Sequence, residues 1–392
     1  MRLGDLLNLK RGYDLPENQR RPGPYPVISS AGVTGYHDEY MVEGQGVVTG
    51  RYGTLGEMYY VNGKYWPHNT ALYVTTFKGN DPKYIYYLLS CLGRIHTSDK
   101  SAVPGVNRNE LHEMAVPAIT EKDQQKKIAA ILSALDAKID CNNRINAELE
   151  AMAKALYDYW FVQFDFPDVH GKPYKSSGGK MVYNATLKRE IPEDWESGRL
   201  EQYISLERGV TYGKEDVCTS SSSGAIGILR ATNVTGNVVD AGDLVYVPSS
   251  RVSSAQTLTK FSTLIVMSSG SKEHVGKNGI YFFDEPLGYG AFCSKITPHA
   301  NARYFVNTFL QSFWFKAYIK NQCLGTNINN LTNGHINKCP VILAKEEILC
   351  FFEDAVKAHY EKMAVNAVEN QQLAQLRDWL LPLLMNGQVT VS

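Results

Sequence analysis

The sequence has no Cys-x-x-Cys pair, no apolar run long enough to cross a bilayer and no excess of either charge. Its seven cysteines are an odd number, so free and mostly buried thiols are expected rather than a zinc site. The start of the chain lacks the apolar stretch of a signal peptide, which predicts a cytoplasmic protein without a membrane partner. Forty basic and forty acidic residues argue against nucleic-acid binding by electrostatics alone.

Motifs of catalysis and nucleotide binding are also missing. There is no Asn/Asp-Pro-Pro-aromatic loop to hold a target adenine and no Phe-x-Gly-x-Gly cofactor loop, both of which adenine methyltransferases carry. The segment from Gly270 to Lys277 has the wrong spacing for a Walker phosphate loop. FPDVHGK resembles a nuclease Pro-Asp…Lys pattern, but it lies in a Gly-rich connector without a second acid at the right distance. We therefore predict no catalytic residue, no metal site and no cofactor in this chain.

What the sequence does contain is an internal repeat. RLGDLLNLKRG near the start returns as RLEQYISLERG at residues 199–209, with the Arg-Gly pair kept. GVNRNEL at residues 105–111 returns as GTNINNL at 325–331, which matches Asn107 with Asn327. A helical segment at residues 142–156 returns at 366–380. Three blocks in the same order indicate a duplicated architecture.

Each copy consists of a β-rich globular half followed by a long helix. Runs such as GEMYYV, TALYVTT, STLIVMSS and GIYFF predict strands, and DPKYIYYLLSCL and ARYFVNTFLQSFWFKAYI each predict one helix. The predicted fold is α+β: two similar β-rich domains with short helices, separated by two long helices, in a pseudo-twofold internal repeat. The predicted globular domains are residues 1–119 and 191–342, the long helices 120–162 and 343–386, the connector 163–190 and the tail 387–392.

The long helices require partners because each is far longer than the usual globular helix. Apolar residues recur at steps of three and four along both, but Asn142, Asn146, Asn366 and Asn370 interrupt the pattern. Asparagine in such a seam is tolerated mainly because it fixes register and partner. We predict an antiparallel coiled coil within the chain, with Asn142 near Asn370, Asn146 near Asn366, and regular pairing ending at Pro382. In the alternative interpretation, the asparagines lie on the solvent side of curved helices.

This order of features resembles the specificity subunit (HsdS) of a type I restriction–modification enzyme. The resemblance covers the whole chain and includes VVTGRYGTLGEMYYVNGKYWPHNTALYV at residues 47–74, IPEDWE at 191–196 and LRDWLLPLLMNGQVTV at 376–391. It implies that each globular half is a target recognition domain, which reads one half of a split, asymmetric site in double-stranded DNA. Half-sites about one helical turn apart, ~10 base pairs, suit such a pseudo-twofold protein.

The resemblance also implies protein partners. Two modification subunits would bind the long helices, and restriction subunits would join the full complex. S-adenosylmethionine, ATP and magnesium would then be used in those partner subunits.

Polar residues at predicted turns are the candidates for DNA contact, because side chains at base edges read sequence while basic groups and amides hold phosphates. The first half offers Arg51, Tyr52, His68, Asn69, Lys100, Asn107 and Arg108. The second half offers Arg230, Asn233, Ser269, Ser271, Lys272, His274, Lys277, Asn278 and Asn327. Arg51 has no clear twin in the second half. Each of these stretches also has a structural interpretation as an ordinary turn.

Two other functions fit the sequence. A protein-binding adaptor would use the Tyr-rich loops for protein contacts, since tyrosine is common at protein interfaces. A stand-alone sequence-specific DNA-binding protein would need no methylase. Apolar residues on the long helices, including Trp160 and Trp379, favour helix partners. Sequence-specific DNA retention in the presence of competitor DNA would distinguish a reader from an adaptor.

Overall fold

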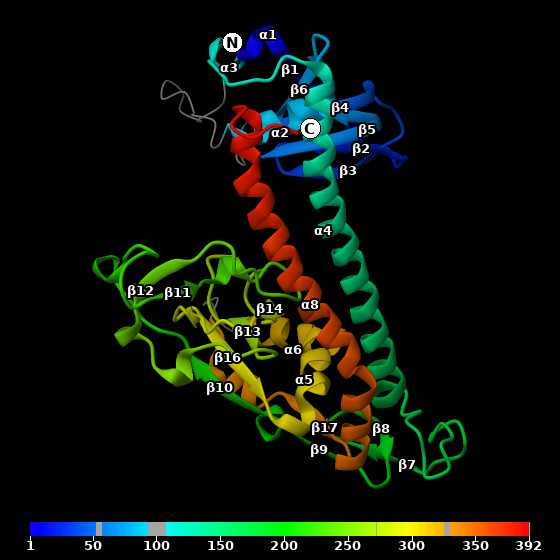
Figure 1. The fold of residues 1–392 in the computed structure, drawn as a ribbon. Coiled ribbons are helices and arrows are strands. Elements are labelled where there is room, and N and C mark those ends of the chain that lie inside the picture. The colour runs from blue at the N-terminus through cyan, green and yellow to red at the C-terminus, as the bar shows by residue number, and fades with distance from the viewer. Residues whose placement is uncertain (52–56, 93–106, 272, 325–329, 392) are drawn as a thin grey trace. The chain divides into compact units, whose positions relative to one another are not determined.

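The structure, a computed structural model, describes residues 1–51, 57–92, 107–271, 273–324 and 330–391. Its contacts divide the chain into two compact units. The first unit contains Met1–Ile139 and Gln372–Ser392, and the second contains Asp140–Gln371. Both long helices, α4 (Lys122–Tyr157) and α8 (Glu346–Met385), contribute residues to each unit (Figure 1).

The first unit is built on a six-stranded sheet with the order β1-β6-β4-β5-β2-β3. Leu3, Leu72, Ile85, Leu132 and Leu384 belong to the core on one side of it, where the short helices and both long helices pack. The described elements of this unit, besides the long helices and a short 3-10 turn at Glu17–Gln19, are α1 (Leu3–Leu6), β1 (Asn8–Arg11), β2 (Tyr25–Ser29), β3 (Gly32–His37), β4 (Val42–Gly50), β5 (Met58–Pro67), β6 (Ala71–Thr76), α2 (Pro82–Cys91) and α3 (Arg108–Glu113).

The second unit repeats this scaffold with its sheet divided in two. One sheet has the order β10-β16-β13-β14 and the other β12-β11-β15. The strands are β10 (Ile204–Arg208), β11 (Ala225–Leu229), β12 (Val245–Pro248), β13 (Thr263–Val266), β14 (Asn278–Ile280), β15 (Gly288–Tyr289) and β16 (Cys293–Pro298). Antiparallel β1–β6 corresponds to β10–β16, and parallel β2–β5 corresponds to β11–β15. The single strand β5 is therefore represented by two strands, β14 and β15, and the predicted internal repeat is confirmed.

The remaining elements of the second unit flank these sheets. Two small sheets pair β7 (Met181–Asn184) with β8 (Arg189–Pro192), and β9 (Glu196–Arg199) with β17 (Pro340–Leu343). The helices are α5 (Arg303–Gln311), α6 (Phe313–Leu324) and α7 (Asn333–Asn337), with a π-helical turn at Asp158–Val162. Short 3-10 turns lie at Leu200–Gln202, Lys214–Asp216, Ala231–Asn233, Ser249–Arg251, Ser254–Gln256 and Ala300–Ala302.

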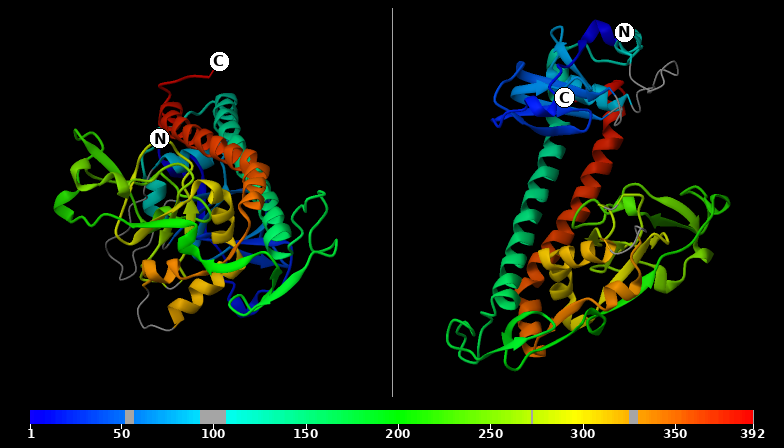
Figure 2. Two further views of the ribbon diagram at one scale, coloured as in Figure 1. Left: turned by 90° about the horizontal axis from the view of Figure 1, so that it is seen from below. Right: turned by 180° about the vertical axis from the view of Figure 1, so that it is seen from behind.

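An aromatic core joins α5 to the ends of the long helices in the second unit. The ring of Phe161 lies 4.8 Å from that of Phe305 and 5.2 Å from that of Phe352, both in edge-to-face geometry. Tyr304 stacks on Tyr360 at 4.5 Å. Figure 2 shows α5 and α6 lying beside α8. Aromatic pairs of this kind contribute beyond their buried area, so this cluster holds α5 in place.

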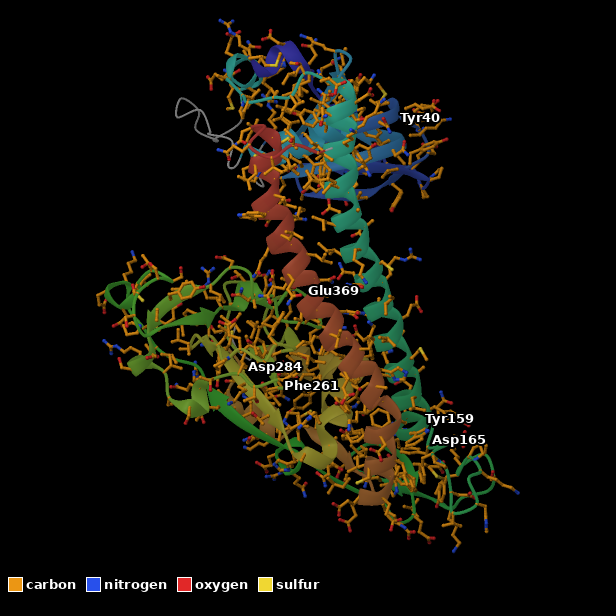
Figure 3. The ribbon with its side chains drawn as sticks, viewed as in Figure 1. Tyr40, Tyr159, Asp165, Phe261, Asp284 and Glu369 are labelled. Carbon is orange, nitrogen blue, oxygen red and sulfur yellow. The ribbon has the colours of Figure 1, made fainter. Side chains whose placement is uncertain are left out.

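Asparagine pairs join α4 to α8 in the second unit. Asn142 Nδ2 donates to Asn370 Oδ1 at 2.9 Å and to Glu369 Oε2 at 2.8 Å, and Glu369 is labelled on α8 in Figure 3. Asn366 Nδ2 donates to Asn146 Oδ1 at 2.8 Å. Because Asn142 and Asn366 are 1% and 0% exposed, the interpretation that places them on a solvent side is wrong. The helices pair antiparallel, and these contacts have the predicted geometry.

The first unit holds its parts of the two helices together by an ion pair. Arg377 Nη1 lies 2.9 Å from Asp136 Oδ1. The other oxygen of that carboxylate accepts a hydrogen bond from Tyr87 of α2 at 2.5 Å. This bond and burial raise the pKa of Tyr87, with burial the larger cause. One carboxylate thereby connects α2, α4 and α8.

The second long helix, predicted over residues 343–386, continues through Pro382 to Met385. Proline removes one backbone donor, but Leu384 and Met385 are buried in the first-unit core and stabilise the extra turn. The helix expected in ARYFVNTFLQSFWFKAYI is interrupted at Ser312, whose hydroxyl accepts the N–H of Phe315 at 3.1 Å and so begins α6. No helix in the described ranges is both long and apolar enough to span a membrane.

Candidate nucleic-acid interface

The first unit carries a tight turn at residues 68–71, between β5 and β6, which we call the first turn. Gly12, at the end of β1, donates its N–H to the Ala71 carbonyl at 3.0 Å. A Cβ at Gly12 would overlap the His68 carbonyl oxygen, so only glycine permits this approach. Arg11 Nε donates to the Asn69 carbonyl at 3.4 Å. The Arg-Gly pair of the repeat therefore frames this turn.

The second unit carries the same arrangement at residues 290–293, between β15 and β16, which we call the second turn. Gly209 donates its N–H to the Cys293 carbonyl at 3.1 Å. A Cβ at Gly209 would overlap the Gly290 carbonyl oxygen. Arg208 Nε donates to the Ala291 carbonyl at 3.2 Å. The two turns are structurally equivalent.

Three of the predicted residues meet at the first turn. Arg51 donates its backbone N–H to the Thr70 carbonyl at 2.9 Å. His68 Nδ1 lies 3.0 Å from the Thr70 hydroxyl, and Asn69 Nδ2 donates to the carboxylate of Asp14. The side chains of Arg51, His68, Asn69 and Thr70 are half-buried, whereas that of Asp14 is exposed. The turn thus gathers donors and acceptors of the kinds that read base edges.

Burial is the larger cause that lowers the pKa of His68, and the charge of Arg20 lowers it further. The imidazole is therefore neutral at pH 7, with one donor and one acceptor nitrogen. A neutral ring beside a hydroxyl reads hydrogen-bonding patterns rather than holding phosphate charge.

The second turn presents different side chains on the same backbone. Phe292 is 67% exposed. Arg208 is also exposed, and it forms no ion pair with any residue that the structure describes. The Phe292 carbonyl accepts the N–H of Met267 at 2.8 Å, as the Thr70 carbonyl accepts that of Arg51. Met267 therefore takes the place of Arg51 and, being buried, supplies no polar group.

The predicted loop at residues 268–278 begins beside the second turn, where Ser268 donates its N–H to the Phe292 carbonyl at 3.2 Å. Ser269 Oγ accepts the Ser271 N–H at 3.3 Å, which closes a local turn. His274 and Lys277 are exposed. Ser271, His274 and Lys277 are thus the exposed candidates in the part of this loop that the structure describes.

A cavity of about 640 Å³ lies between this loop and α6. Lys277, Lys316 and Lys320, which we call the cavity lysines, line it, and none is ion-paired with a described residue. Asn278 lines it as well, but its buried amide accepts from Gln311 Nε2 at 2.6 Å and donates to a backbone carbonyl. The cavity lysines suit phosphate, whereas Asn278 supports the wall.

Arg230 and Asn233 hold their own loop together. Arg230 Nη2 forms an ion pair with Asp243 at 2.6 Å. Asn233 is 3% exposed, and its amide accepts the Arg230 N–H at 2.8 Å while donating to the carbonyls of Asp240 and Asp243 at 2.9 Å. Asn233 therefore has a structural role here, because every hydrogen bond of its amide is internal.

Asn107 is the N-cap of α3, where its side chain accepts the Asn109 N–H at 3.0 Å. The equivalent N-cap in the second unit, at the start of α7, is Thr332. After α3, the Met114 carbonyl accepts the N–H of Leu3 at 2.9 Å, and after α7 the Cys339 carbonyl accepts that of Leu200 at 2.9 Å, which supports this equivalence. The match of Asn107 with Asn327 stays a prediction, because Asn327 lies outside the described residues. Arg108 is exposed beside Asn109.

Four predicted residues, Tyr52, Lys100, Lys272 and Asn327, lie outside the described residues. Sequence reasoning also missed five candidates, namely Arg11, Arg208, Phe292, Lys316 and Lys320. The repeat itself was the available signal for Arg11 and Arg208, since both precede its glycines. Within the described ranges, no three His, Cys, Asp or Glu side chains lie together as metal ligands.

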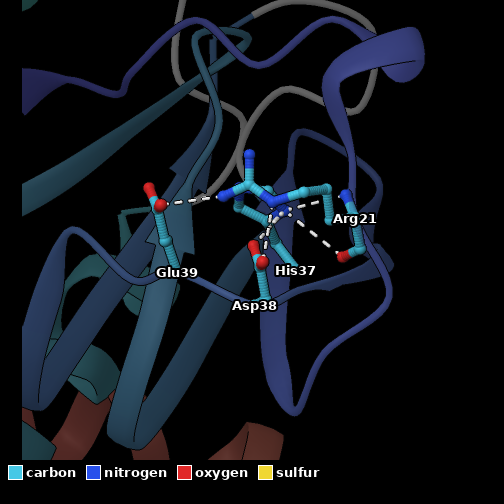
Figure 4. Close-up of polar contacts among 4 residues, drawn as sticks. All are labelled: Arg21, His37, Asp38 and Glu39. Atoms are coloured by element: carbon cyan, nitrogen blue, oxygen red, sulfur yellow. Dashed lines mark hydrogen bonds and ion pairs between the residues drawn. The ribbon is translucent and has the colours of Figure 1, made fainter.

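An exposed ion-pair cluster was also missed in the first unit. The guanidinium of Arg21 contacts the carboxylates of Asp38 and Glu39, each at 2.7 Å (Figure 4). The backbone N–H of Arg21 donates to His37 Nδ1 at 3.1 Å. The hydrogen bond from Arg21 lowers the pKa of Asp38. The cluster ties the segment after Leu15 to the end of β3. Because its one guanidinium is paired with two carboxylates, the cluster is a poor candidate for holding phosphate.

Comparison with known proteins points to one family. The family model described as "Type I restriction modification DNA specificity domain" matches residues 1–151. The StySPI specificity subunit of Salmonella potsdam is 28% identical over 208 residues, 52% of this chain and 45% of that protein. The EcoKI specificity subunit of Escherichia coli K12 is 28% identical over 212 residues, 51% of this chain and 44% of that protein. The chain thus spans less than half the length of these two relatives.

Longer matches exist as well. The MjaIX specificity subunit of Methanocaldococcus jannaschii is 25% identical over 315 residues, 79% of this chain and 69% of that protein. Among solved structures, the S subunit of a type I restriction–modification system from M. genitalium aligns with a TM-score of 0.55 and 16% identity, covering 98% of this chain and 95% of that one. At this identity, the likeness shows a shared fold.

Proposed function

Because the chain belongs to the family of type I restriction–modification specificity subunits, we propose that it is the DNA-reading subunit of such a system. The members of this family are recognition components, so the chain is non-catalytic. It would bind double-stranded DNA in the cytoplasm.

The observation that carries this proposal is the pair of equivalent turns. Both are framed by the same Arg-Gly pair, but the first presents His68, Asn69 and Thr70 while the second presents Phe292. A duplicated scaffold with different side chains at matching positions is suited to reading two different half-sites. The proposed site is therefore bipartite and asymmetric, with one half-site for each globular half. The cavity lysines would hold backbone phosphates next to the second half-site.

The long helices would bind the partner subunits. Trp379 is 63% exposed on α8, and Phe351 and Val365 are also exposed on that helix, as Met152 is on α4. Large apolar side chains at the surface are frequent anchors of protein interfaces. We propose that two modification subunits dock on these helices and that restriction subunits join the full complex. S-adenosylmethionine would then be used by the modification subunits, and ATP and magnesium by the restriction subunits.

Methylome sequencing tests this proposal. Cells that express the chain together with its neighbouring modification subunit would be compared with cells that lack the chain. A new adenine mark at a split, asymmetric sequence is the expected result. If the complex assembles but no new mark appears, the DNA-reading function is wrong and the protein-binding adaptor is favoured. Retention on site-containing DNA against competitor DNA would then decide between those two functions.

A further inference from the structure

Phe292 occupies an unusual place for a large apolar residue. Its ring is exposed, whereas the next residue, Cys293, is fully buried at the start of β16. The backbone on both sides is fixed: Gly290 donates to the Leu229 carbonyl at 2.9 Å, and the Phe292 carbonyl accepts from Met267 and Ser268. The ring is therefore presented to solvent by a well-held turn and contributes little to the core.

Arg208 lies beside this ring through its bond to the Ala291 carbonyl, one residue before Phe292. Among the residues that the structure describes, only Nε of Arg208 is engaged, and its two terminal nitrogens have no partner there. In the first turn, by contrast, Arg11 Nη2 is paired with Asp14 at 3.2 Å. Thr211, at the position that corresponds to Asp14, has no charge to offer Arg208. Arg11 and Arg208 thus make the same contact with a turn carbonyl, but a terminal nitrogen of Arg11 is paired with a carboxylate and those of Arg208 are paired with none that the structure describes.

We infer that Phe292 and Arg208 read base edges in the half-site of the second unit, an inference that rests on the proposed DNA-reading function. The guanidinium donates two hydrogen bonds to O6 and N7 of a guanine, and the ring packs on the C5-methyl group of a thymine. Both contacts belong to the major groove. The first turn, with a neutral imidazole, an amide and a hydroxyl, reads its half-site by different chemistry.

The test uses the full chain assembled with its modification subunit, and a DNA duplex that contains the sequence identified by the methylome experiment. Fluorescence anisotropy would compare the wild-type chain with Phe292→Ala and Arg208→Lys. Phe313→Ala is the matched control, since Phe313 is a highly exposed phenylalanine on α6 of the same unit. Because Phe292 and Arg208 are exposed, neither change should impair folding, and a thermal melt would check this.

Arg208→Lys should lower discrimination at one guanine of the second half-site about tenfold, because the lysine ammonium lacks the rigid planar fork whose two N–H groups match O6 and N7. Phe292→Ala should weaken binding and relax selection at one thymine of that half-site, and leave positions in the first half-site unchanged. Replacing that thymine by deoxyuridine removes its methyl group. It should cost the wild type about fourfold in affinity and cost Phe292→Ala nothing.

Two results would overturn the inference. In the first, Phe292→Ala binds every sequence less tightly by the same factor, which would make the ring a general contact. In the second, deoxyuridine has the same effect on the wild type and on Phe292→Ala, which would exclude contact with the methyl group. Failure of the proposed function is distinct from both, because the wild type would then show no preference for any sequence.

Discussion

Glu353 provides a test of how the second unit is held together. This residue of α8 caps the start of α5, where its Oε1 accepts the N–H groups of Tyr304 and Phe305, both at 2.8 Å. Burial raises the pKa of Glu353 to about 7, although these N–H donors and the charge of Arg303 favour the ionised form. The carboxyl group is therefore half-protonated near neutral pH in the folded protein.

The sign of the resulting pH dependence follows from this raised pKa. The folded state binds the proton more tightly than the unfolded state, so the stabilisation is fully present below about pH 4.5. It is lost as the pH rises through about 7. At 1.36 kcal/mol per pKa unit, the loss between pH 4.5 and pH 8 is about 3 kcal/mol. Glu353→Gln keeps a neutral acceptor at this position and should remove the loss.

Urea denaturation at pH 5 and pH 8, with amide exchange of the α5 backbone as a local measurement, would test this. The difference in unfolding free energy between Glu353→Gln and wild type should be small at pH 5 and should favour the variant at pH 8 by about 3 kcal/mol. The control is Glu361→Gln, whose carboxylate is exposed and 3.9 Å from Lys357, and which should show no such change. Parallel pH profiles for Glu353→Gln and wild type would refute the reasoning.

Three further predictions concern the helices, the turns and the cavity. Asn146→Ala removes the acceptor of the buried Asn366 amide and should lower the unfolding free energy by about 1–3 kcal/mol in urea denaturation. Leucine at both Asn146 and Asn366 should restore most of the lost unfolding free energy. If the double leucine variant lost as much as Asn146→Ala, the pairing of these asparagines would be contradicted. Gly209→Ala should cost about 1–3 kcal/mol because its Cβ overlaps a carbonyl oxygen. Gly270→Ala should change the unfolding free energy little, because a Cβ there meets open space. Similar melting temperatures for Gly209→Ala and Gly270→Ala would contradict the close approach of Gly209 to the Gly290 carbonyl. Alanine at the three cavity lysines should reduce the slope of log Kd against log salt, measured by anisotropy, by about 0.9 for each phosphate that the variant no longer binds. An unchanged slope would exclude these lysines from phosphate binding.

The repeat and the long helices could be predicted because their signals are local. The spacing of apolar residues reports a helix face directly, and the interrupting asparagines indicated which helices pair. The Arg-Gly match likewise survives in the structure as two equivalent turns. Each of these features depends on residues that are close together in the sequence or are repeated in it.

The candidate site was less predictable because burial is a tertiary property. Asn233 and Asn278 look like surface residues by type, yet each is buried with its amide bonded within its own region. Lys316 and Lys320 come near Lys277 only because α6 packs beside the loop after β13. Phe292 was overlooked because an aromatic residue next to a strand is usually assigned to the core. Sequence therefore identified the turn regions better than the side chains that they expose.

The composition of the first unit has a consequence for synthesis on the ribosome. Leu384 and Met385 lie in the same core as Leu3 and Leu6, so residues encoded far apart in the message complete one domain. The nascent first half must wait, with part of its apolar surface uncovered, until translation has passed residue 385. The second unit draws on one continuous stretch, residues 140–371, and is free to fold earlier. A premature stop after residue 371 would thus damage the half that is made first.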